Sequence, residues 1–238
     1  MRIVLIGYGK MGKAIERIAI EKGHEILLKI DLHNGHELTI ENLSKGDVAI
    51  EFTGPSSAPA NLLKCAEAGI PVVCGSTGWL EEYAVIKKAF EKSGSAFLYA
   101  SNFSIGVNIF FELNKKLASL MTPHREYSVE MIEIHHTQKK DAPSGTAITL
   151  AEQIITEIPT LKKWVNRPGL DPAELPILSE RIDLAAGTHE VKYRSPIDDI
   201  EIIHTAHSRE GFAGGAVLAA EFLQHKKGIF TMKDVLGF

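Results

Sequence analysis

Short apolar runs alternate with amphipathic stretches through the first hundred residues. The run Ile3–Ile6 is followed by apolar positions that repeat at helical spacing, namely Met11, Ala14, Ile15, Ile18 and Ala19. The same alternation predicts strands at 25–30, 47–52, 70–74 and 96–99, with helices at 57–68 and 81–92. The predicted strands 25–30 and 47–52 are apolar on both faces, as is typical of a parallel sheet buried between helices. The pattern therefore predicts an α/β, doubly wound parallel sheet with right-handed crossovers.

After residue 104 the pattern changes. Helical spacing at 107–120 and 144–158 lies among alternating strands at 127–135, 189–194 and 200–207. Residues 159–180 contain several prolines, which predicts an irregular excursion, and the alanine-rich helix at 211–223 can return to the first sheet. We therefore expect a first domain of residues 1–104 completed by 210–238. Residues 105–209 are expected to form a second, α+β domain with a mixed or antiparallel sheet.

Composition narrows the classes of function. The 238 residues carry 26 lysines and arginines against 30 acidic residues, with no basic block suited to a nucleic acid. No apolar run approaches the roughly 20 residues of a membrane-spanning helix. Cys65 and Cys74 are too few for a disulfide framework and lack the spacing of a zinc site, so we expect both to be buried and reduced. The apolar run near the N-terminus is too short for a signal peptide, which predicts a cytoplasmic location.

A glycine motif lies between the first predicted strand and the first predicted helix. Its residues are Gly7, Tyr8, Gly9, Lys10, Met11 and Gly12. Such glycines let the backbone approach a pyrophosphate at a helix N-terminus, and Asp31 ends the next strand, where a carboxylate can accept from a ribose. This context predicts a Rossmann-type dinucleotide site. Loops 52–55, 75–78 and 100–103 follow later strands and would carry the nicotinamide half, although turn residues of this kind occur in any loop.

The densest chemistry lies in residues 133–146. A strand ends in His135 and His136, Lys139 follows, and Ser144 opens a helix, which together predict a positive pocket suited to a carboxylate or phosphate. Neighbouring strand residues face opposite sides, which favours one histidine as acid or base and the other as a packing residue. A zinc site is an alternative without a supporting motif, in which His189, His204 and His207 would join His135 or His136.

The segment 133–146 closely resembles the active-site motif of the dihydrodipicolinate reductase family, also called 4-hydroxy-tetrahydrodipicolinate reductases, of bacterial lysine and diaminopimelate synthesis. The resemblance extends over nearly the whole chain, through residues 7–12, 75–78, 102–108, 187–189, 203–209 and 228–236. It departs in the glycine motif, which is one residue shorter than usual and has Lys10 where arginine is usual. Segments 34–46 and 159–180 are brief or hard to align.

The resemblance implies a role for each matching residue. His135 would be the general acid, Lys139 the partner of a substrate carboxylate, and His136, Gly145 and Thr146 the lining of the substrate pocket. NADH or NADPH would be held by Gly7, Tyr8, Gly9, Lys10, Met11, Gly12, Asp31, Gly75, Ser76, Thr77, Ala100, Ser101, Asn102 and Phe103. It also implies hydride transfer to a small cyclic dicarboxylate, no metal, and a homotetramer joined through the second-domain sheets.

The preference between NADH and NADPH depends on Asp31. Its carboxylate favours the ribose hydroxyls of NADH over the 2′-phosphate of NADPH, whereas Lys10, Lys29 and His33 could offset the repulsion. We therefore expect the protein to use both cofactors, with NADH at least as good a substrate as NADPH.

Three alternatives to the reductase stay open: a related oxidoreductase such as an aspartate dehydrogenase, a non-catalytic dinucleotide-sensing regulator, and a metal-dependent hydrolase built on the C-terminal histidines.

Overall fold

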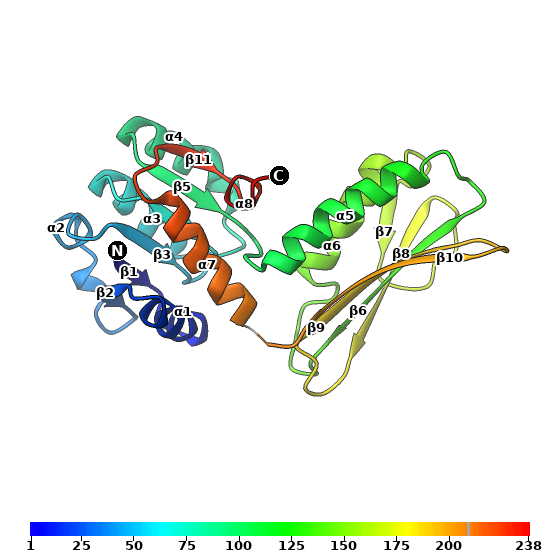
Figure 1. The fold of residues 1–238 in the computed structure, drawn as a ribbon, viewed down its shortest axis with the longest axis horizontal. Helices are drawn as coiled ribbons and strands as arrows, with labels where there is room; N and C mark the ends of the chain where they lie inside the picture. Colours follow the sequence, from blue (N-terminus) through cyan, green and yellow to red (C-terminus); the bar gives the residue numbers. More distant parts are fainter. Residues whose placement is uncertain (209) are drawn as a thin grey trace. The chain divides into compact units, whose positions relative to one another are not determined.

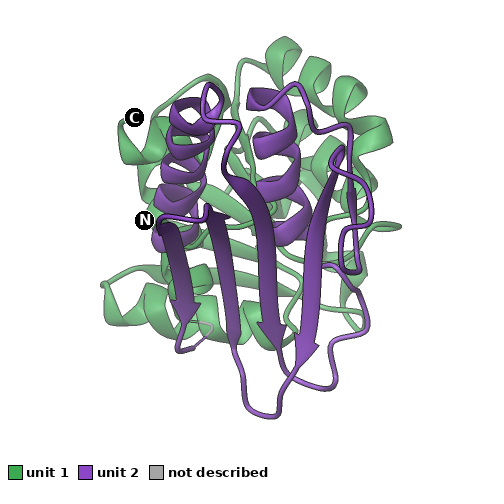
Figure 2. Ribbon diagram, turned by 90° about the vertical axis from the view of Figure 1, so that its right-hand side faces the viewer, with its two compact units in different colours: residues 1–105, 210–238 green, residues 106–209 purple. Residues whose placement is uncertain are grey.

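The computed structural model describes residues 1–208 and 210–238, and the chain divides into two compact units. Unit 1 comprises residues 1–105 and 210–238, and unit 2 comprises residues 106–209 (Figure 1, Figure 2). The boundary expected at residue 209, and Arg209 of the family-like run 203–209, lie outside the described residues.

Unit 1 is built on a six-stranded parallel sheet of order β11-β5-β4-β3-β1-β2. Its strands are β1 (Arg2–Ile6), β2 (Glu25–Ile30), β3 (Val48–Glu51), β4 (Val72–Cys74), β5 (Ala96–Tyr99) and β11 (Gly228–Phe230). Its helices are α1 (Lys10–Glu21), α2 (Ile40–Leu43), α3 (Ala58–Ala68), α4 (Tyr83–Ser93), α7 (Glu210–Leu223) and α8 (Met232–Leu236), with 3₁₀ turns at Gly35–Glu37 and Leu80–Glu82. The doubly wound parallel sheet is thereby confirmed.

Alternate side chains of the strands enter two different cores, because successive strand residues point to opposite faces. Ile3 and Leu5 of β1 pack with α1 and α7, whereas Val4 and Ile6 pack with α3 and α4. None of these four side chains is more than 1% exposed. The two faces of the sheet are therefore both covered, which explains why the strands read as continuous apolar runs.

Unit 1 differs from expectation at its margins. The expectation that the strand at 25–30 is buried on both faces is wrong, because β2 is an edge strand and exposes Glu25 and Lys29. The sequence pattern also missed β11 and α8, because three strand residues and five helical residues are too few to show a period. Cys65 and Cys74 are buried free thiols, as expected.

Unit 2 is a five-stranded mixed sheet of order β10-β9-β6-β8-β7. Its strands are β6 (Ser128–His135), β7 (Lys163–Val165), β8 (Glu174–Arg181), β9 (Gly187–Arg194) and β10 (Asp199–Ala206). Strand β6 pairs in parallel with β8 and antiparallel with β9, which confirms a mixed sheet. The helices α5 (Ile105–Met121) and α6 (Gly145–Glu157) pack on one face through a shared apolar core (Figure 2).

The expectation of an irregular segment at 159–180 is wrong. It contains β7 and most of β8, and β8 pairs with the central strand β6. Pro176 lies within β8, and a proline argues against a central strand because it lacks the amide hydrogen that a ladder needs. Among the described residues no helix is both long enough and apolar enough to cross a membrane.

Candidate active site

In the turn after β1, the backbone at Gly7 and Gly12 packs closely against other backbone atoms. Gly7 has a φ of +98°, and a Cβ there would lie 2.2 Å from the carbonyl oxygen of Phe52. A Cβ at Gly12 would lie 2.3 Å from the carbonyl oxygen of Gly7. Gly9 is the N-cap of α1 and has no atom within 4 Å of where its Cβ would be, so the helix N-terminus is open on that side. This is the cradle that a pyrophosphate requires.

Loops after β3, β4 and β5 meet at the same edge of the unit 1 sheet, because parallel strands place their carboxyl ends together. The Thr53 amide donates to Ser76 Oγ at 2.8 Å, and the rings of Phe52 and Phe103 lie 5.7 Å apart. A Cβ at Gly75 would lie 2.2 Å from the Phe52 ring. The structure therefore brings the predicted loops 75–77 and 100–103 together. Within them Ser76, Asn102 and Phe103 are buried, while Thr77 and Ser101 are exposed.

Asp31 directly follows β2 and is exposed. Its Oδ1 accepts from the Leu32 amide at 2.8 Å, and its own amide donates to Asn34 Oδ1 at 2.7 Å. These bonds hold the turn in which the carboxylate lies, at the carboxyl end of a strand that neighbours β1. Lys10 and His33 are also exposed. The position of Asp31 is the one at which a carboxylate accepts from an adenosine ribose.

Lys29 forms an ion pair within the protein itself. Its Nζ pairs with Glu16 Oε1 at 2.7 Å, and the Tyr8 hydroxyl donates to the same carboxylate. Hydrogen bonds from Lys29 and Tyr8 lower the pKa of Glu16, which keeps this carboxyl ionised. The expectation that Lys29 offsets the charge of Asp31 is thereby weakened, because a phosphate would have to displace Glu16.

The end of β6 places a polar row across the sheet of unit 2. The strand register pairs Glu133 with Ser179 of β8 and with His189 of β9, and pairs His189 with His204 of β10. The row before it is entirely apolar and consists of Ile177, Met131, Val191 and Ile202. Glu133 has no exposed surface, and His189 is 5% exposed. Polar groups therefore replace the apolar core at this end of the strand.

Glu133 is the centre of this row. Its Oε2 accepts from the Ser144 amide at 3.0 Å, and its Oε1 accepts from Arg181 Nη2 at 3.2 Å. Burial raises the pKa of this carboxyl, but its contacts with His135 and Ser144 outweigh burial and hold the pKa well below its usual range. Glu133 is therefore a buried anion at neutral pH.

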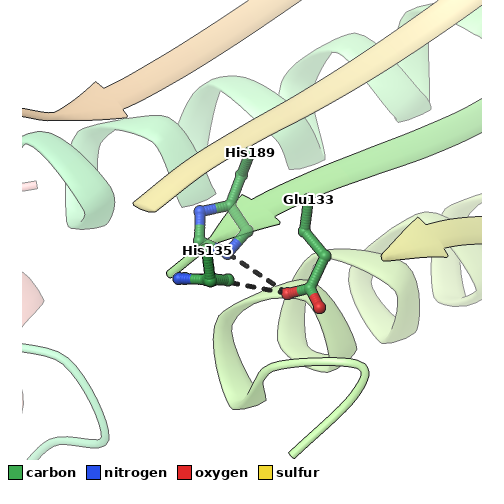
Figure 3. Close-up of side chains that lie close together, drawn as sticks. All are labelled: Glu133, His135 and His189. Atoms are coloured by element: carbon green, nitrogen blue, oxygen red, sulfur yellow. Dashed lines mark ion pairs between the residues drawn. The ribbon is translucent and has the colours of Figure 1, made fainter. Parts of the chain in front are cut away.

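His135 lies beside this anion, with Nε2 at 3.4 Å from Glu133 Oε2 (Figure 3). That ring nitrogen is buried and makes no well-aligned hydrogen bond with the described residues. The ring stands edge-on to His189 at 5.1 Å between centroids, and a Cβ at Gly187 would lie 3.0 Å from its Cε1. The absence of a side chain at Gly187 therefore makes room for the imidazole.

His189 is tied to the start of α6. The Ser144 hydroxyl caps that helix by accepting from the Ala147 amide at 3.2 Å, and it lies 3.0 Å from His189 Nε2. The two atoms are hydrogen-bonded, and the tautomer of the His189 ring decides which of them donates. Burial lowers the pKa of His189 to about 3. His189 is thus a neutral imidazole rather than an imidazolium.

The segment 136–146 folds back onto the end of β6. Arg181 Nη2 donates to the Asp141 carbonyl at 2.7 Å, and Lys139 Nζ pairs with both oxygens of the Asp141 carboxylate at 2.9 and 2.7 Å. Gly145 and Thr146 form the first turn of α6, and the half-buried His136 directly follows β6. The five unit 2 residues that the sequence singled out therefore lie within one short segment anchored by Glu133 and Arg181.

Glu133, His135 and His189 also have the spacing of metal ligands, with one ligand atom from each within 4.8 Å of the others. In this structure Glu133 Oε2 accepts from the Ser144 amide and His189 Nε2 is hydrogen-bonded to the Ser144 hydroxyl, so the three side chains form part of a hydrogen-bonded network. Of the histidines that the zinc alternative invoked, His135 and His189 belong to this group, whereas His136, His204 and His207 do not.

Sequence reasoning missed Glu133 and Arg181 as functional residues, and it considered His189 only as a ligand of the zinc alternative. A signal existed for Glu133, because it occupies an inward position of β6 two residues after the buried Met131. No local signal identifies Arg181, whose place depends on the register that pairs it with His135 across β6 and β8.

Two family models match successive parts of this chain. The one described as dihydrodipicolinate reductase, N-terminus, matches residues 1–103, and the one described as dihydrodipicolinate reductase, C-terminus, matches residues 106–236. The chain belongs to the dihydrodipicolinate reductase family. The two matches divide this family member close to the boundary between units 1 and 2.

Individual relatives agree with the family. The 4-hydroxy-tetrahydrodipicolinate reductase of Christiangramia forsetii is 53% identical over 239 residues, which cover 100% of this chain and 98% of that protein. The protein of the same name from Methanosarcina barkeri is 40% identical over 204 residues, covering 84% of this chain and 76% of that protein. A solved dipicolinate-bound dihydrodipicolinate reductase from Paenisporosarcina sp. TG-14 has a TM-score of 0.76 at 23% identity and covers 97% of both chains. This last likeness confirms the fold.

Proposed function

We propose that this member of the family reduces 4-hydroxy-tetrahydrodipicolinate to tetrahydrodipicolinate with NADH or NADPH, with loss of water. The observation that carries the proposal is the segment that holds His135, Lys139 and the start of α6 at one end of unit 2. A proton donor and two sources of positive potential are what a dianionic ring needs during reduction. The likeness to a reductase of that name over the full chain supports the same substrate and favours it over an aspartate dehydrogenase.

Lys139 and the N-terminus of α6 would bind the substrate carboxylates. The Lys139 ammonium already faces a carboxylate, that of Asp141, so a substrate carboxylate exchanges one charge-assisted contact for another. Gly145 and Thr146 open the helix, whose N-terminus favours an anion. His136 lies beside them as a pocket-lining residue.

His135 is the proton donor in this proposal. Negative charge develops on the substrate ring as it is reduced, and an imidazolium within reach neutralises it by proton transfer. His189 is not suited to this role, because burial lowers the pKa of His189 to about 3 and its Nε2 is already hydrogen-bonded to Ser144.

Unit 1 fits a nicotinamide dinucleotide. Cβ atoms at Gly7 and Gly12 would meet backbone oxygen at 2.2 and 2.3 Å, so the turn leaves space only for backbone and a close ligand. Asp31 would accept from the adenosine ribose, and loops 75–77 and 100–103 would hold the nicotinamide end. The bound cofactor supplies the hydride. The proposal keeps dual use of NADH and NADPH, with NADH at least as good because Lys29 is paired with Glu16.

The proposal extends to a cytoplasmic homotetramer. Both cysteines are buried free thiols, which suits a reducing compartment. The face of the unit 2 sheet opposite α5 and α6 is covered by no other element of that unit among the residues described (Figure 2). Ile203 on this face is 54% exposed, which supports association through the sheet.

The function is tested by supplying the condensation product of pyruvate and aspartate semialdehyde and following the loss of reduced nicotinamide. We expect turnover that depends on this substrate, which would exclude a non-catalytic regulator, and none with oxaloacetate and ammonia, the pair an aspartate dehydrogenase reduces. In His135→Gln, kcat falls by about 100-fold and KM changes less. His136→Gln changes the neighbouring residue in the same way and should lower kcat less. No nicotinamide oxidation, or equal kcat losses in both variants, would contradict the proposal.

A further inference from the structure

Glu133 is a buried anion in a polar row that directly follows an entirely apolar row of the sheet. Removing a carboxylate from water costs several kcal/mol even after relaxation, so a charge at this depth needs compensation. Arg181 and the Ser144 amide supply part of it, at 3.2 and 3.0 Å. An apolar side chain, such as that of Met131 one row earlier, would fill the same layer without this cost. The charge therefore indicates a task beyond packing.

We infer that Glu133 is the positioning residue of His135: its Oε2 accepts the proton on Nε2, so that Nδ1 is the atom that donates to the substrate. Nε2 lies 3.4 Å from this oxygen and has no other partner among the described residues. Nδ1 lies on the side of the ring away from Glu133 (Figure 3). Hydrogen bonds of catalytic groups are often long without ligand and shorten in the complex. The inference rests on the proposed function, since it needs His135 to act as an acid.

The proton balance is simple. Before the reaction both ring nitrogens of His135 carry a proton, with Nε2–H directed at Glu133. The Nδ1–H bond then breaks, and its proton goes to the ring carbon that bears the negative charge. A neutral imidazole with Nε2–H remains, and solvent returns a proton to Nδ1. Glu133 stays ionised throughout, as a carboxylate that orients a histidine does in other acid–base pairs.

The other charged and titratable groups around His135 have different partners. His189 from β9 is hydrogen-bonded to the Ser144 hydroxyl, and Arg181 from β8 divides its Nη2 between Glu133 and the carbonyl of Asp141. Lys139 is paired with the Asp141 carboxylate. Glu133 is thus the group that can fix the Nε2 proton.

A double-mutant cycle tests this coupling. In the wild-type background Glu133→Gln should lower kcat by about 30-fold with little change in KM, because orientation of the acid is lost while the substrate contacts stay. In the His135→Gln background the same change should lower kcat by less than about threefold, since the residue it acts through is gone. Equal losses in both backgrounds would overturn the inference. Glu130→Gln is the control, because Glu130 lies on β6 but on its opposite face. Calorimetric binding of pyridine-2,6-dicarboxylate checks that unit 2 is intact in each variant.

A second measurement needs neither a variant of Glu133 nor substrate. Nitrogen-15 spectra of the wild-type protein, with the His135 signals assigned by their loss in His135→Gln, report which nitrogen of the neutral ring bears the proton. We expect Nε2–H, and Nδ1–H would overturn the inference even if Glu133→Gln fails to fold. Failure of the proposed function would look different, because the wild-type protein would then not oxidise NADH with the condensation product at all.

Discussion

At the scale of single residues, Lys139 holds a carboxylate even without substrate, through its pair with Asp141. We expect Lys139→Ala to lower kcat/KM by at least about 100-fold, or about 2.7 kcal/mol, because a charge-assisted contact with the dicarboxylate is lost. NADH affinity should stay unchanged, since the cofactor residues lie in unit 1. Lys140→Ala is the neighbouring control. Steady-state kinetics that show less than a fivefold loss for Lys139→Ala would contradict its role.

Asp31 carries the prediction on cofactor preference. With Lys29 held by Glu16, the exposed carboxylate of Asp31 meets the ribose with little opposing charge. We expect kcat/KM for NADH to equal or exceed that for NADPH, and Asp31→Ser to shift the ratio toward NADPH because the repulsion of the 2′-phosphate is removed. Glu41→Ser, at an exposed helical position of unit 1, should leave the ratio unchanged. A wild-type advantage for NADPH above about tenfold, roughly 1.4 kcal/mol, is the result that this reasoning cannot accommodate.

At the scale of elements, hydrophobic periodicity predicted the helices and strands that are determined by local sequence. It found the strands of the first sheet other than β11, both long helices of unit 2, and the strands β6, β9 and β10 of the mixed sheet, because each lies in a long enough apolar or periodic stretch. It also placed His135 and Lys139 in one segment. It could not place Arg181 or His189 beside Glu133, since that depends on the pairing of β6 with β8 and β9. Strand β8 was missed because its proline and its glutamates look like a loop.

Glu174 connects strand β8 to the residues around it. It begins β8, and its carboxylate accepts from Arg167 Nη2 at 2.9 Å and from the Leu170 amide at 3.3 Å, with Lys163 Nζ of β7 at 3.3 Å. The hydrogen bond from Arg167 is the main cause that lowers the pKa of Glu174 to about 2. The carboxylate therefore joins β7 and the following turn to β8.

We expect Glu174→Gln to lower the denaturant midpoint of unfolding at pH 7. A carboxyl whose pKa is depressed by folding stabilises the native state above its unfolded pKa, and this stabilisation is lost as pH falls through the folded value. The difference between wild type and Glu174→Gln should therefore shrink from about pH 4.5 down to pH 2. Glu152→Gln, at an exposed position of α6, is the control and should unfold like the wild type. A midpoint for Glu174→Gln that matches the wild type at pH 7 would show that the carboxylate is dispensable.

At the scale of the whole molecule, unit 1 is completed by a segment that follows unit 2 in the chain. Helix α7 packs on α1, and Glu221 of α7 accepts from Lys22 Nζ and pairs with His24 Nε2, each at 2.8 Å. The alanine-rich pattern predicted the return of this helix, because small side chains allow close packing against the sheet. At Gly215 the helix lies so close to the loop after β5 that a Cβ would be 1.8 Å from the carbonyl oxygen of Phe103. That contact joins α7 to a loop proposed to hold the nicotinamide.

The open face of the unit 2 sheet carries the prediction on assembly. One cross-strand row on that face contains Leu178, Ile132, Glu190 and Ile203. Apolar side chains at 54% exposure, as for Ile203, are stabilised when another sheet covers them. In the proposed tetramer, Ile203→Asp would bury an unpaired charge at each interface, which favours dissociation.

Light scattering should therefore give a tetramer mass for the wild type and a smaller mass for Ile203→Asp. The matched control is Ile197→Asp, because Ile197 is 90% exposed but lies in the turn between β9 and β10 rather than on the face. It should leave the mass unchanged. Circular dichroism should show that both variants keep their strands and helices, since neither side chain belongs to a core. A tetramer that withstands Ile203→Asp would mean that association uses another surface, and a monomeric wild type would remove the proposed assembly altogether.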